Sequence, residues 1–135
     1  MNRTEAREYM MQTIFQMEAS HDFDVNQKHT YMRETIPAGQ KEYCDDLFSL
    51  ICNKREIIDQ VIDQFSIGWT NQRMPKTDLA ILRVAACELL FMPTIPAAVS
   101  INEAVELAKK YGTDESSGYI NGILGKIHKD GQKHE

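Results

Sequence analysis

The sequence predicts an all-α fold of six or seven helices within one domain, and three observations support this. A chain of 135 residues with 42% hydrophobic side chains is long enough to bury a core of its own. Its apolar residues recur every three or four positions, and strand-like alternation is scarce. Proline and glycine fall between the periodic stretches. We expect two sub-bundles, about residues 1–68 and 74–130, with Trp69 as a wedge between them.

The first half of the chain is predicted to hold three or four helices. Apolar side chains at helical spacing predict the first helix over residues 3–19. A short second helix is expected over residues 27–35, and the sequence Pro37-Ala38-Gly39 is expected to stop it. A third helix begins near Tyr43, and the apolar positions in residues 57–65 predict either its extension or a fourth helix.

The first helix of the second half is marked by proline at both ends. Pro75 suits the first turn of a helix, and Asp78 then lies near the positive end of the helix dipole. An apolar stripe predicts one buried face, with Arg83 and Glu88 on other faces. Pro93 ends this helix.

Two further helices are predicted after this proline. Ser100 and Glu103 have the spacing of a capping box, in which each side chain satisfies a backbone amide at the start of a helix. That helix ends before Gly112. Thr113 or Asp114 is expected to cap the last helix.

The charge balance argues against a strong nucleic-acid binder that acts alone. The formal net charge is −5, and the acidic excess lies in residues 1–72. An RNA site would therefore have to be a local patch, or a basic partner would have to complete it.

Several classes of function lack support in the sequence. The three cysteines form no CxxC pair, which suggests free thiols in a cytoplasmic protein, and no secretory signal is visible. The four histidines lack metal-ligand spacing, and nucleotide-binding, GxSxG and HExxH motifs are missing. We therefore expect no catalytic site, no metal and no cofactor. The longest uncharged stretch is too short for a membrane span.

Four segments carry longer motifs. They are AREYMMQTIF (6–15), DLAILRVAACEL (78–89), IPAAVSINEAVELAKKYG (95–112) and SSGYINGILGKI (116–127). Together, and in this order, they closely resemble the NusB family of bacterial transcription antitermination factors. The resemblance covers essentially the whole chain, and the segments in the second half are the more specific.

The resemblance implies a fold and a set of partners. NusB-family proteins are all-α, with two helical sub-bundles. They bind the boxA element of single-stranded nascent RNA together with NusE, which is also a ribosomal protein. With other Nus factors they join the elongating RNA polymerase and suppress termination, notably in ribosomal RNA operons. Neither catalysis nor a cofactor is involved. A basic ribosomal partner would supply the positive charge that this chain lacks.

The resemblance also implies RNA contacts at five positions. Arg3 and Arg7 lie in the first helix, whose arginines contact RNA in the family, although both could be ordinary surface residues. Tyr119 occupies an aromatic position suited to base stacking, and its alternative role is in the core. Glu115 and Ser116 precede it, where they could accept hydrogen bonds from base amino groups or simply cap the helix.

Two positions are implied at the protein interface. Asp78 matches an acidic position that faces the ribosomal partner in the family, and its alternative role is to complement the helix dipole. Phe15 aligns with an aromatic position near the same junction, and its alternative role is in the core.

Two other functional classes are compared with antitermination. NusB-like accessory domains of ribosomal RNA cytosine methyltransferases are fused to a large cofactor-binding domain, for which 135 residues leave no room. A helical protein-interaction adaptor with little RNA affinity remains an alternative, because the basic cluster in the first helix is sparse.

Overall fold

The first helix begins and ends where the sequence predicts. Helix α1 spans Arg3–Ala19, and Asn2 caps it. The Asn2 side chain accepts a hydrogen bond from the Glu5 amide at 2.8 Å, while the Glu5 carboxylate accepts one from the Asn2 amide at 3.0 Å. Glu5 therefore has a structural role at the helix start. The computed structural model describes residues 1–66 and 73–133, so Trp69 lies outside the described residues.

The next segment holds a short helical region and one long helix. A 3-10 turn over Val25–Gln27 leads into α2, which spans only Lys28–Tyr31. This helix is shorter than predicted, and none of its residues is fully buried, so packing gives a longer helix little support. Helix α3 spans Ala38–Phe65 without a break, and Pro37 stands at its N-cap. Residues 57–65 thus extend the third helix.

Helix α4 is enclosed on all sides. It spans Lys76–Phe91, packs against α1, α3, α5 and α6, and buries every residue from Asp78 to Glu88. The prediction that Arg83 and Glu88 lie on other faces is therefore wrong, since these side chains are only 2% and 1% exposed. One apolar stripe in the sequence could not show that four helices surround this one.

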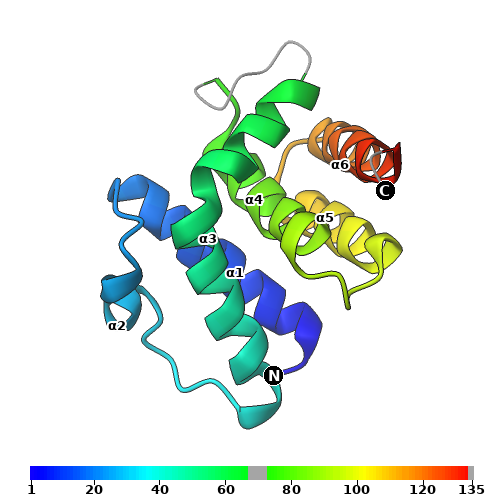
Figure 1. The fold of residues 1–135 in the computed structure, drawn as a ribbon. Coiled ribbons are helices and arrows are strands. Elements are labelled where there is room, and N and C mark those ends of the chain that lie inside the picture. The colour runs from blue at the N-terminus through cyan, green and yellow to red at the C-terminus, as the bar shows by residue number, and fades with distance from the viewer. Residues whose placement is uncertain (67–72, 134–135) are drawn as a thin grey trace.

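Two helices complete the second half. Helix α5 spans Ala97–Tyr111 with Pro96 at its N-cap, so the predicted capping box is wrong. Ser100 lies inside the helix and donates a hydrogen bond to Glu88 at 2.7 Å. Helix α6 spans Ser116–Lys133, beginning after the two residues expected to cap it. In the described part of the chain the fold is all-α, with six α-helices and no strand (Figure 1).

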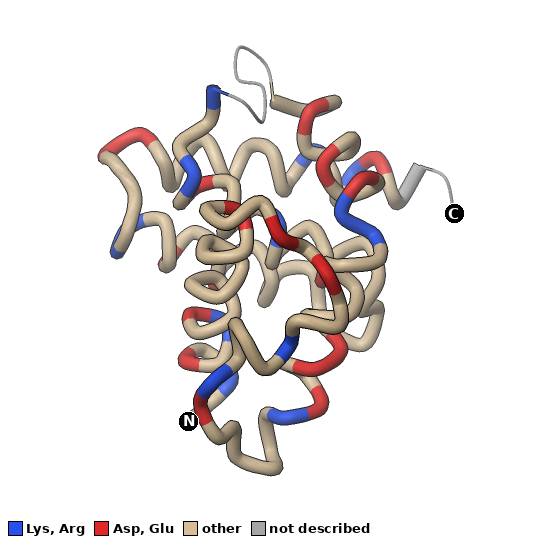
Figure 2. Tube along the Cα trace, turned by 90° about the vertical axis from the view of Figure 1, so that its left-hand side faces the viewer, with Lys and Arg blue, Asp and Glu red and all other residues tan. Residues whose placement is uncertain are grey.

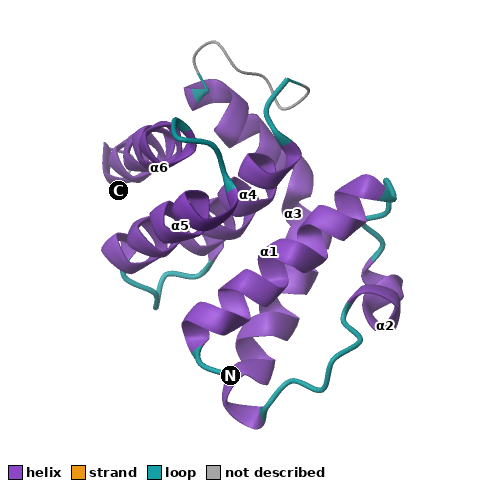
Figure 3. Ribbon diagram, turned by 180° about the vertical axis from the view of Figure 1, so that it is seen from behind, coloured by secondary structure: helices purple, strands orange, loops and turns teal. Residues whose placement is uncertain are grey.

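The helices form two neighbouring groups that meet at α4. In Figure 1, α1, α2 and α3 lie on one side of the molecule and α4, α5 and α6 on the other. Seen from behind, α1 and α3 run side by side, while α2 stands at the edge beyond them (Figure 3). Within the described ranges, no helix is long and apolar enough to cross a membrane.

Buried ionic groups fasten α4 to its neighbours. The Glu88 carboxylate accepts hydrogen bonds from the Arg7 guanidinium of α1 at 2.9 and 3.1 Å and from the Tyr43 hydroxyl of α3 at 2.6 Å. In the middle of α4, Arg83 donates to both carboxylate oxygens of Asp59 on α3 at 2.9 Å. These partners offset the cost of burying charge inside the fold.

Candidate functional site

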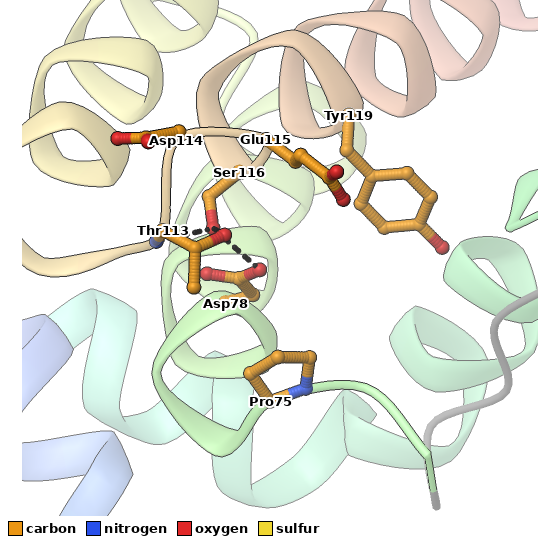
Figure 4. A pocket seen from close by; sticks show the side chains of 7 residues that line it. All are labelled: Pro75, Asp78, Thr113, Asp114, Glu115, Ser116 and Tyr119. Carbon is orange, nitrogen blue, oxygen red and sulfur yellow. Dashed lines mark hydrogen bonds between the residues drawn. The ribbon is translucent and has the colours of Figure 1, made fainter.

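A pocket lies where the first turn of α4 meets the loop between α5 and α6 (Figure 4). It encloses about 420 Å³, within the range of small-ligand sites. Its lining comes from the start of α4, the loop after α5 and the first turn of α6, namely Pro75, Asp78, Thr113, Asp114, Glu115, Ser116 and Tyr119. Four residues predicted as two separate interfaces thus share one pocket.

Asp78 lines this pocket as a buried side chain. It is 4% exposed, and its Oδ2 accepts a hydrogen bond from the Ser116 hydroxyl at 3.0 Å. Its Oδ1 is buried and has no hydrogen-bond partner among the described residues. Burial raises the pKa of the Asp78 carboxyl above its usual value, although the Ser116 hydrogen bond acts in the opposite direction. Asp78 is therefore largely enclosed, and its contact with a protein partner stays a prediction.

The raised pKa predicts a pH-dependent effect of Asp78→Asn. Because the folded state disfavours the charged carboxyl, protonated Asp78 stabilises the fold at low pH, and this contribution fades as the pH rises from the unfolded-state value of 3.8 through the folded-state pKa. We expect Asp78→Asn to raise the free energy of unfolding by about 1 kcal/mol near pH 7 and by almost nothing near pH 3. Urea unfolding across this range measures it. The exposed control Asp114→Asn should show no such trend, and an equal gain at both ends of the range would contradict the prediction.

The loop at the pocket rim is held in place by Ser116. Its hydroxyl accepts a hydrogen bond from the Thr113 amide at 2.9 Å while donating to Asp78. Gly112 is needed beside it, because a Cβ there would lie 2.5 Å from the Ser116 Oγ and 2.8 Å from the Ala108 carbonyl oxygen. The packed start of α6 thereby fixes the backbone that carries Tyr119. The Tyr119 side chain is partly exposed and lines the pocket.

A groove lies on the other side of the start of α4. It encloses about 360 Å³ between α1 and the end of α5, and its lining residues are Met11, Gln12, Phe15, Gln16, Thr77 and Tyr111. Thr77 lines the groove, and its neighbour Asp78 lines the pocket. Phe15 is thus partly exposed in a concave surface, as a protein interface requires.

Tyr111 is held at the groove by a polar cluster. Its hydroxyl donates a hydrogen bond to Glu8 and accepts one from Gln12 at 3.1 Å. Lys110 also contacts the Glu8 carboxylate, at 2.9 Å. The Tyr111 hydroxyl and Lys110 hold the pKa of Glu8 below its usual value. A local cation therefore balances the negative charge of Glu8 in the first helix.

The two arginines of α1 lie away from the pocket. Arg7 is 4% exposed, and it contacts Glu103 at 3.3 Å in addition to its hydrogen bonds with Glu88. Its guanidinium belongs to the interior, so we leave Arg7 out of any RNA surface. Arg3 is partly exposed and lies 4.3 Å from the centre of the Tyr43 ring, with its Nε donating to Gln40 at 2.7 Å. Arg3 and Phe15 are about 18 Å apart along the helix axis.

Charges of both signs are interleaved over the molecule. Figure 2 shows basic and acidic positions close together along the trace, including at the start of α1. The described residues contain no group of three or more potential ligands that could hold a metal ion. Burial raises the pKa of the Cys44 thiol to about 11 and that of Cys87 to about 12, which makes both poor nucleophiles.

Comparison with known proteins identifies the family. The NusB family model matches residues 4–129. The chain belongs to the NusB family. The transcription antitermination protein NusB of Alkaliphilus oremlandii is 42% identical over 127 residues, covering 93% of this chain and 92% of the relative. NusB of Agathobacter rectalis is 40% identical over 130 residues, covering 94% of this chain and 99% of the relative.

Solved structures agree with the NusB fold. NusB of T. maritima superposes with a TM-score of 0.86 at 34% identity, covering 96% of this chain and 92% of the other. A chain in the crystal structure of antitermination factors NusB and NusE in complex with double-stranded RNA superposes with a TM-score of 0.81 at 20% identity, covering 95% of this chain and 96% of the other. The latter likeness shows the fold.

The structure brings four predicted residues into one pocket, whereas the resemblance to NusB missed several of their neighbours. Thr113 and Asp114 were read only as helix caps, although both line the pocket. Tyr111 and Met11 of the groove were not singled out either. Tyr111, an aromatic residue just before a helix-ending glycine, was a usable signal, whereas the helical spacing of the buried Met11 predicts only a core position.

Proposed function

We propose that this protein is a transcription antitermination factor that binds boxA-type RNA together with the ribosomal protein NusE. With other Nus factors it would help the elongating RNA polymerase to read through terminators, notably in ribosomal RNA operons. Membership of the NusB family supports this proposal, because relatives at about 40% identity over nearly the whole chain carry the antitermination name. We further propose that the protein works in the cytoplasm, without catalysis or a cofactor.

The observation that carries the RNA proposal is the pocket beside Tyr119. An aromatic ring at the edge of a concave, polar site is a platform on which an unpaired base can stack. Glu115 lies at the rim, where its carboxylate can accept from a base amino group, whereas Ser116 contributes by fixing the loop. Arg3 can add a contact to a phosphate from the other end of α1.

The groove around Phe15 supports the proposed site for NusE. Its lining includes Met11 and the aromatic rings of Phe15 and Tyr111, and these residue types are enriched at protein interfaces. Because Thr77 of the groove and Asp78 of the pocket are consecutive residues at the start of α4, a partner in the groove would lie close to RNA in the pocket. A basic partner there would supply positive charge close to the RNA.

A titration tests both contacts. BoxA-type and scrambled RNAs are titrated against the protein with and without NusE, and we expect the boxA preference to be strongest with NusE. Tyr119→Ala should weaken RNA binding about tenfold while leaving NusE affinity unchanged. Phe15→Ala should weaken NusE binding about tenfold. Tyr31→Ala, on the peripheral helix α2, is the control and should change neither.

One observation favours a second candidate, a protein-interaction adaptor with little RNA affinity. The burial of Arg7 removes one of the two cations expected to contact RNA. The same titration separates the two functions. Absence of any RNA sequence preference, with or without NusE, would overturn the antitermination proposal and leave the adaptor.

A further inference from the structure

The polar side chains of the pocket are almost all hydrogen-bond acceptors. Three carboxylates line it, from Asp78, Asp114 and Glu115, and the described lining contains no lysine, arginine, histidine or amide side chain. The Ser116 hydroxyl already donates to Asp78, and the Oδ1 of this buried carboxylate still lacks a partner among the residues described. The Asp78 Oδ1 is buried, so the exposed Glu115 carboxylate is the acceptor beside Tyr119 that a ligand can reach, and a polar ligand group that meets it must be a donor.

The geometry places one acceptor beside the stacking platform. In Figure 4 the Glu115 carboxylate lies next to the Tyr119 ring, whereas Asp114 points away from that ring. A base stacked on Tyr119 would thus present its edge to Glu115. Asp78 is packed more deeply, so it contributes negative charge at the pocket wall and holds the rim through Ser116.

We propose that this pocket selects guanine among the four bases of single-stranded RNA, through its Watson–Crick edge. The inference rests on the proposed RNA-binding function and names the base that this site takes. Guanine is the base with two adjacent donors, N1–H and the N2 amino group, which match the two oxygens of a carboxylate. Uracil has one N–H between two carbonyl groups, and these would face negative oxygens. Adenine and cytosine place an acceptor nitrogen next to their amino group.

Charge and size distinguish a base from the other ligands. A phosphate in the pocket would face three carboxylates at close range, so the RNA backbone must pass outside. An arginine side chain of a partner protein also carries paired donors. However, a single guanidinium would fill only a small part of about 420 Å³, whereas a base with its sugar fills more of it and covers the Tyr119 ring.

The test uses uridine-rich RNA oligomers that differ at one position. This position carries guanosine, inosine, adenosine or uridine, and binding is measured with the wild-type protein in the presence and absence of NusE. We expect guanosine to bind about tenfold more tightly than uridine, the selectivity of one bidentate pair. Inosine lacks the N2 amino group and should lose most of this preference. Glu115→Ala should bring the guanosine-to-uridine ratio to within about twofold of unity.

Glu106→Ala is the matched control, because it removes the same charge from an exposed position of α5 that does not line the pocket. It should leave the guanosine preference unchanged. RNA binding without a guanosine preference would overturn this inference and leave the proposed function intact, whereas no RNA binding in any format would overturn the proposed function itself. If Glu115→Ala weakens NusE binding tenfold and leaves the base preference unchanged, the pocket holds a cationic side chain of the partner, and the guanine assignment is wrong.

Discussion

Replacing Glu88 with alanine is expected to lower the free energy of unfolding by about 3–5 kcal/mol. The wild-type carboxylate neutralises Arg7 and also accepts hydrogen bonds from Tyr43 and Ser100, so one side chain joins α4 to α1, α3 and α5. Without it, the buried Arg7 guanidinium keeps a contact with Glu103 and with the Tyr43 ring but loses the carboxylate that neutralises it inside the fold. Such a loss is a large part of the stability of a domain of this size.

Urea unfolding of wild type and variant gives this difference directly. Glu106→Ala is the control. It removes an exposed ion pair with Lys109 within α5 and should cost no more than about 0.5 kcal/mol. A cost below 1 kcal/mol for Glu88→Ala would mean that water or rearranged side chains replace the carboxylate. The interior network would then not hold the helices together.

Gly112→Ala should combine a loss of stability with a loss of RNA binding. The new Cβ would clash with the buried Ser116 side chain and with the Ala108 carbonyl oxygen, which cannot move without shifting α5. We expect a cost of about 1–3 kcal/mol, since relief of the clash must displace the loop. The Ser116 bonds to Thr113 and Asp78 would then break, and the pocket would lose its shape.

A second glycine provides a matched control. Gly118 lies in α6, one residue before Tyr119, and a Cβ there meets no atom within 4 Å. Gly118→Ala should therefore stabilise the helix by about 0.5–1 kcal/mol and keep RNA affinity unchanged. Thermal unfolding and RNA titration of both variants check the pair. If the two substitutions behave alike, the close approach at Gly112 does not control the pocket.

The sequence predicted most helices because local signals determine them. In α1 the apolar spacing alone predicted both ends, and the structure adds the Asn2 cap. In α5 two local signals competed. Ser100 and Glu103 have the spacing of a capping box, but Pro96 fixes the backbone one turn earlier, and Glu88 takes the Ser100 hydroxyl.

The site was predicted less completely because its geometry depends on distant residues. Nothing in the sequence near Arg7 shows that its partner is Glu88, 81 positions away. Arg7 was therefore predicted as a surface cation although it lies in the interior. Asp78 is a further example, since its burial depends on Ser116 packing over it from α6. Motifs were enough to name several residues of the pocket. The packed structure was needed to show which of them are open to a ligand.

The enclosure of α4 has a consequence for how this protein opens. Helix α4 contacts α1, α3, α5 and α6, so a local fluctuation of α1 and α3 alone, or of α5 and α6 alone, cannot release it. Amide protons of α4 should therefore exchange with solvent only through global unfolding, whereas those of α2 should exchange almost at once. Separating the chain into its two halves would remove the common core from one of them, so the halves should fold together or not at all.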